Sequence, residues 1–179
     1  MGSTRTRALQ NQTLPAGRLS FLSKQRTRHD NDFYQAVFCF EHAGLKLERL
    51  VAYAYLLRRT AQRIALKDGQ SITKNEAYFR AAESFVVCAG LSSLGKRLRY
   101  FELAADCFSL TGGSHASAAA TAYHCAEKFT QAAVHFKQAG MFDEVVDVIL
   151  FHRDKVDAKV AERCLSIAKL HFHREGQFQ

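Results

Sequence analysis

Histidine and cysteine are the side chains of this sequence that first suggest chemistry, because they bind zinc and act as bases or nucleophiles. The chain has eight histidines and five cysteines, and the cysteines form no CxxC pair. His171 and His173 are two residues apart, which places them on nearly opposite faces of a helix. Cys125 and His135 fall on successive predicted helices and could meet. Taken together, the spacing predicts no metal site and no cofactor.

Catalytic motifs are also missing from the sequence. It contains no GxSxG and no HExxH. It also lacks the phosphate-binding GxxxxGK[ST], of which Gly95-Lys96-Arg97 is the nearest approximation. The acids Asp143, Glu144 and Asp147 follow a glycine turn, where acidic residues stabilise the first turn of a helix. The cysteines lie on or next to apolar helical stripes, as buried thiols do. We therefore expect no catalytic residue and no enzyme.

Two basic clusters are the candidate binding residues, and they comprise Arg59, Arg63, Lys67, Lys96, Arg97 and Arg99. The first three recur at every fourth residue and form one helical stripe, whereas the other three crowd the start of another predicted helix. Such clusters could contact nucleic acid or an acidic partner. We favour the simpler interpretation of solvated helix faces. The 14 phenylalanines and 6 tyrosines recur at helical core spacing, which disfavours a base-stacking platform.

The net charge of +8 is concentrated at the N-terminus. Residues 1–29 contain no acid and six basic side chains, namely Arg5, Arg7, Arg18, Lys24, Arg26 and Arg28. This leaves a net charge of +2 for residues 30–179, so the high isoelectric point is mainly a property of the first segment. We predict a disordered basic tail over 1–29 and one helical repeat domain over 30–179.

The N-terminal segment also bears on localisation. It lacks the apolar core of a secretory signal, and no run of about 18 apolar residues predicts a membrane span. Its composition fits a mitochondrial transit peptide as a minor alternative, and Met1–Thr6 formally fits a myristoylation pattern. We expect an intracellular protein, cytoplasmic or nuclear, with no membrane partner.

From Asp30 onward the apolar residues follow the helical period, and the single proline is Pro15. Eight helices are predicted, over 30–43, Leu47–Leu66, 74–89, 96–110, 114–126, 130–139, Phe142–Phe151 and Asp157–Arg174. The expected N-terminal signals are Asp30, Asn31 or Asp32 for the first helix, the capping box Thr73–Glu76, Ser114 and Thr130. The fold class is therefore all-α, with no alternating strand pattern.

Four of these helices share a packing pattern that ends at a glycine. The stretches are QAVFCFEHAG (35–44), AAESFVVCAG (81–90), LAADCFSLTG (103–112) and QAAVHFKQAG (131–140). Each has alanine eight residues before the glycine and phenylalanine or valine four residues before it. The small residue lets a neighbouring helix approach, the large one fills the gap, and the glycine supplies the positive φ of a helix stop. His135 replaces Cys39, Phe85 or Cys107 in this pattern, so we expect it to be partly buried.

A repeated pattern of this kind favours an α-solenoid of antiparallel helical hairpins. The kernel Ala-x3-Phe-x2-Ala, found at Ala36-Phe40-Ala43 and Ala132-Phe136-Ala139, resembles the second helix of a tetratricopeptide repeat. The constant 34-residue period and the closing proline of that repeat are absent.

A second resemblance covers roughly residues 33–175, through FYQAVFCFEHAGL, AYAYLLRRTA, FRAAESFVVCAG, FELAADCFSLTG, FTQAAVHFKQAGMFDEVVDVI and DKVDAKVAERCLSIAKLHFHREG. These stretches resemble the helical region of large fungal proteins of the TPR-and-ankyrin-repeat-containing, UvrD-like helicase family. In that family the region follows a superfamily 1 helicase-like ATPase. The resemblance implies an accessory piece or a truncated relative without the ATPase.

The predicted function is a protein–protein interaction or scaffold module with an unidentified protein partner. The alternative is a nucleic-acid-binding accessory module of a superfamily 1 helicase-like protein. Five residues make the last predicted helix, Asp157–Arg174, apolar on much of its circumference: Leu165, Ile167, Ala168, Leu170 and Phe172. We therefore expect this helix to contact a neighbouring repeat of a longer chain or a second copy.

Overall fold

The computed structural model describes residues 28–68 and 72–176, so residues 1–27 of the predicted tail lie outside the described part. The described residues confirm the all-α class and contain no strand. Their helices are α3 Arg28–His42, α4 Lys46–Asp68, α5 Ile72–Gly90, α6 Leu94–Ser109, α7 Ala116–Cys125, α8 Phe129–Gln138, α9 Phe142–Phe151 and α10 Ala158–Arg174. A short 3₁₀ turn, η2 (Arg153–Lys155), precedes α10. All eight predicted helices are present in the predicted order.

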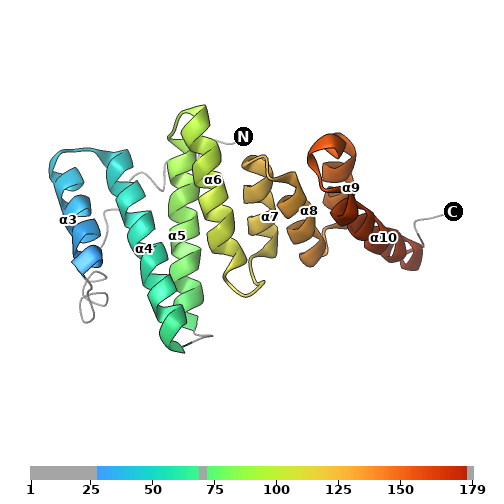
Figure 1. The fold of residues 1–179 in the computed structure, drawn as a ribbon, viewed down its shortest axis with the longest axis horizontal. Helices are drawn as coiled ribbons and strands as arrows, with labels where there is room; N and C mark the ends of the chain where they lie inside the picture. The colour runs from blue at the N-terminus through green and yellow to red at the C-terminus, as the bar shows by residue number, and fades with distance from the viewer. Residues whose placement is uncertain (1–27, 69–71, 177–179) are drawn as a thin grey trace.

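The helices stand side by side in chain order and alternate in direction, giving an elongated molecule (Figure 1). Each helix packs principally on the helices before and after it, and α10 also packs on α8. This arrangement is compatible with a solenoid. The alternation puts the turns 43–45, 91–93 and 126–128 along one side of the row, the upper edge in Figure 1. The turns 110–115 and 139–141 lie on the opposite side, here called the lower edge.

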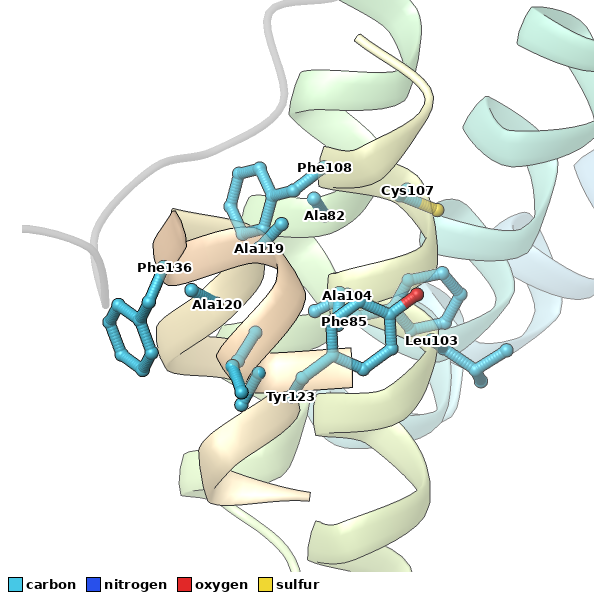
Figure 2. Close-up of a cluster of buried hydrophobic side chains, with 14 of the residues drawn as sticks. Ala82, Phe85, Leu103, Ala104, Cys107, Phe108, Ala119, Ala120, Tyr123 and Phe136 are labelled. Carbon is cyan, nitrogen blue, oxygen red and sulfur yellow. The ribbon is translucent and has the colours of Figure 1, made fainter. Parts of the chain in front are cut away.

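The alanine and the phenylalanine or valine of the repeated pattern contribute to the core, but the degree of burial differs between helices. Ala82, Ala104 and Ala132 are fully buried, and Phe108 and Phe136 are nearly so. Figure 2 shows such side chains from α5, α6, α7 and α8 gathered in one cluster. In α5 the large position is Val86, which is exposed, and Phe85 fills the core instead. The pattern therefore identifies the packed helix faces but assigns the filling residue of α5 wrongly.

The glycine stops are confirmed at three of the four predicted positions. Gly44, Gly112 and Gly140 have φ values of +70°, +76° and +74°, which side chains with a Cβ rarely adopt. Gly90 is the exception, because it is the last residue of α5 and does not have a positive φ. The chain leaves α5 through Leu91 and Ser92, whose backbone N–H groups still bond to the last carbonyls of that helix.

The predicted N-caps are mostly wrong. Asp30, Asn31 and Asp32 lie inside α3, Thr73 lies inside α5, and His115 rather than Ser114 precedes α7. Thr130 lies inside α8, where its hydroxyl accepts a hydrogen bond of 3.0 Å from the backbone N–H of Asp157. A cap contributes only about 1 kcal/mol, so packing of the apolar faces readily shifts a helix start. Asp157 does cap α10, since its carboxylate accepts a hydrogen bond from the Val160 N–H.

Candidate functional site

The structure separates the two basic clusters. Arg59 and Arg63 lie on the second half of α4, toward the lower edge, and the side chain of Lys67 lies outside the described side chains. Lys96, Arg97 and Arg99 lie on the first two turns of α6, at the upper edge (Figure 1). Because α5 runs between α4 and α6 in the opposite direction, the clusters are roughly 20 Å apart along the helix axes. They do not form one continuous basic surface.

Arg99 is held by an ion pair within α6, and its partner Glu102 also pairs with Lys128 in the α7–α8 turn. Its guanidinium donates a 2.8 Å hydrogen bond to Glu102, whose other carboxylate oxygen lies 3.3 Å from the Lys128 ammonium. The hydrogen bond from Arg99 lowers the pKa of the Glu102 carboxyl and raises the pKa of Arg99. Lys96 and Arg97 are exposed and form no ion pair within residues 28–68 and 72–176. These two cations are therefore the more accessible part of the upper cluster.

The histidines and cysteines of the described residues are spread over several helices. Within the part of the chain that the structure describes, no group of three or more histidine, cysteine or acidic residues could hold a metal ion. The sequence left open that Cys125 and His135 could meet, and the structure places their side chains apart. His135 stacks on Tyr123 of α7, with ring centroids 5.2 Å apart, and Cys125 is exposed two residues further along the same helix. Residues two apart on a helix face different directions.

Three of the five cysteines fill the core as predicted, namely Cys88, Cys107 and Cys164. Burial raises the pKa of the Cys88 and Cys107 thiols to about 12, so neither is a thiolate nucleophile near neutral pH. Cys39 and Cys125 are exposed, which corrects the expectation of five buried thiols. Cys39 lies on α3, the first described helix, which packs chiefly on α4.

A cluster of rings that the sequence did not suggest joins the α7–α8 turn to the end of α9. Phe129 stacks on His152 with ring centroids 3.6 Å apart, and the His124 ring lies 5.7 Å from that of His152. Lys155 lies over Phe129 and forms a 3.6 Å ion pair with Glu127. The cluster holds two turns together, and its histidines and acid come from two segments that lie about 25 residues apart in the sequence, at 124–127 and at 152. Sequence spacing therefore gave no signal for it.

The exposed apolar side chains are the main surface feature. The large ones are Phe38, Leu45, Leu66, Val86, Leu91, Leu94, Leu110, Leu150, Phe151, Ile167 and Leu170. In α10, Ala168 is buried, and Leu165 and Phe172 are partly buried toward the rest of the molecule. Ile167 and Leu170 remain 42% and 59% exposed, one helical turn apart. The open apolar face of α10 is thus narrower than its sequence predicted.

Comparisons with protein-family models, with curated proteins and with solved structures found no match to this chain. No helix among the described residues is long and apolar enough to cross a membrane.

Proposed function

We propose that this protein is an interaction scaffold that binds a protein partner through the open face of its last helix. The observation that carries the proposal is the pair Ile167 and Leu170, exposed on the terminal helix of an elongated row. In solenoids each helical pair buries its apolar stripe on the next, so an apolar terminal face is suited to a neighbouring repeat or a second copy. Binding rather than catalysis is the mechanism that we propose.

The resemblance to the helical region of UvrD-like helicase family proteins suggests which larger protein this scaffold would serve. It would make the chain an accessory piece, with tetratricopeptide-like hairpins, of a helicase-like ATPase or a relative of one. A cytoplasmic or nuclear setting is also part of the proposal, since five cysteines without disulfides suit a reducing compartment.

The test compares the full chain with the double variant Ile167→Ser/Leu170→Ser. Arg163→Ser/Lys169→Ser is the matched control, because these residues are also exposed on α10 but are not apolar. Analytical ultracentrifugation over a concentration series measures self-association, and cross-linking in cell extract measures partner binding. We expect the apolar variant alone to lose about tenfold or more in affinity, as central apolar contacts do when removed.

A chain that stays monomeric and whose cross-linked partners are unchanged by Ile167→Ser/Leu170→Ser would contradict the proposal. The nucleic-acid alternative is examined in the same preparations with a labelled oligonucleotide at low salt. Tight, salt-sensitive binding that falls after charge reversal of Arg59, Arg63, Lys96 and Arg97 would replace the protein partner with nucleic acid.

A further inference from the structure

The turn between α5 and α6 combines exposed leucines with unpaired cations. Leu91 and Leu94 are 53% and 68% exposed, and Leu45 in the neighbouring α3–α4 turn is 45% exposed. Lys96 and Arg97 follow Leu94 and Gly95 on the first turn of α6, and Lys46 follows Leu45. All are exposed, and Figure 1 shows the α5–α6 turn at the top of the molecule, beyond the ends of α4 and α7.

The α5–α6 turn carries charge of one sign. Residues 90–100 contain Lys96, Arg97 and Arg99 and no acid. The neighbouring α3–α4 turn has mixed charge, because Glu41, which pairs with Arg49, and Glu48 lie on either side of Lys46. In α6, Glu102 is bonded to Arg99 and Lys128. A partner at the tip therefore meets a positive potential around exposed apolar side chains.

The shape and the charge together favour one kind of partner. Leu91 and Leu94 stand in a projecting turn rather than along a helix face, so they suit a broad surface with an apolar interior. A phospholipid bilayer has that interior, and anionic headgroups above it attract lysine and arginine. A nucleic acid would satisfy the cations but leave the leucines without apolar contacts.

We propose that the tip formed by Leu91, Leu94, Lys96 and Arg97 docks on the surface of an anionic phospholipid bilayer. This goes beyond the proposed scaffold function and uses the edge of the molecule away from Ile167 and Leu170. It also departs from the sequence-based expectation of no membrane partner. That expectation rested on the lack of a spanning segment, and surface docking requires none.

The absence of tryptophan from the chain allows a direct test. Leu94→Trp places one reporter at the tip, and Leu110→Trp places a matched reporter at the other end of α6, where Leu110 is also exposed. Each full-length variant is mixed with phosphatidylcholine vesicles that either contain or lack phosphatidylserine. Emission wavelength and quenching by brominated acyl chains report whether the indole enters the bilayer.

We expect the emission of the Leu94→Trp variant to shift to the blue and to be quenched with anionic vesicles only. Leu110→Trp should remain unchanged. Adding Lys96→Glu and Arg97→Glu to Leu94→Trp should weaken vesicle binding by about tenfold or more, because each cation near the surface contributes on the order of 1 kcal/mol. Circular dichroism checks that each variant is folded, and Leu91→Trp serves as a second tip reporter.

Several outcomes would overturn the proposal. One is that neither tip reporter responds to anionic vesicles. This outcome also covers a protein that binds the vesicles through its basic segment 1–29 alone. Another is that the tip and Leu110→Trp reporters respond equally. A third is an equal response to neutral vesicles. A response to an oligonucleotide or to polyglutamate, without one to vesicles, would assign the tip to a different occupant. Loss of the tip response with intact binding through α10 would leave the scaffold function unaffected.

Discussion

At the scale of single residues, His135 is the position whose role the repeated pattern did not explain. Its packing in the structure now explains it. Its ring is half-buried against Tyr123, and its Nδ1 atom is buried without a hydrogen-bond partner. Burial lowers the pKa of this imidazole, and a hydrogen bond with Gln138 opposes that shift only in part. The folded protein therefore holds His135 neutral, which suits a core position and not a proton-transfer site.

The lowered pKa gives His135 a pH signature. Because the folded state binds the proton less readily than the unfolded state, the contribution to stability is present above about pH 6.5 and is lost as pH falls through the lowered value. We predict that His135→Phe keeps the stack on Tyr123, raises the free energy of unfolding by about 1 kcal/mol and flattens its acid dependence. Urea unfolding at several pH values from about 5 to 7.5, where histidine side chains titrate, measures how the free energy of unfolding depends on pH.

The control for that experiment is His173→Phe at an exposed position of α10. This variant removes a histidine from the surface, so it provides the baseline against which the effect of His135→Phe is measured. An equal flattening in both variants, or a loss of stability in His135→Phe above 1 kcal/mol or so, would show that the buried ring has another role.

At the scale of elements, the start of α10 depends on α8. The hydroxyl of Thr130 accepts the Asp157 N–H, and the Asp157 carboxylate accepts the Val160 N–H. These bonds fix the first turn of α10 on the preceding hairpin, in a region where the chain arrives through the short turn η2. Thr130 therefore helps to set the orientation of α10, and with it the direction in which Ile167 and Leu170 point.

We predict that Thr130→Val destabilises the protein by about 1 kcal/mol, since the Asp157 N–H loses its partner. Hydrogen exchange should rise in the first turn of α10. Thr121→Val is the matched control, because the Thr121 hydroxyl is exposed and bonds only to the carbonyl of Ser117 in its own helix. Equal effects of the two variants, measured by denaturant unfolding and exchange, would refute this role of Thr130.

Helix identity was predictable because apolar spacing is set by the core, and the boundaries of α9 were predicted to the residue. Cap positions such as Thr73 and Thr130 were not, because a local signal of about 1 kcal/mol yields to packing across helices. The sequence identified which basic and apolar residues could bind a partner, but it did not show which of them lie on the same surface. Arg63 and Lys96 end on opposite edges because of the intervening α5, and the exposure of Leu94 depends on where its turn points.

At the scale of the whole molecule, the row of helices confines the effect of each core residue. Phe85 contacts Tyr55 and Tyr100 of the helices on either side of α5, whereas Phe136 lies in α8 at the other side of the cluster in Figure 2. Since the principal contacts join chain neighbours, a defect in one helix is transmitted mainly to the next.

We predict that Phe85→Leu accelerates hydrogen exchange in α4, α5 and α6, and that Phe136→Leu does so in α7, α8 and α9. Each should cost about 1–3 kcal/mol, and each variant is the control for the other. Exchange mass spectrometry localises the change. A uniform increase over residues 28–176 in both variants would instead indicate a single cooperative unit.

The neighbour-to-neighbour contacts also bear on how the chain reaches its fold. Since few principal contacts span distant parts of the sequence, folding requires little loop closure and should be fast. Each helix of the row from α3 to α7 has its principal partners as soon as the next helix has been made. Pairing of these helices can therefore follow their order of synthesis, whereas docking of α10 requires both α8 and α9 to be in place.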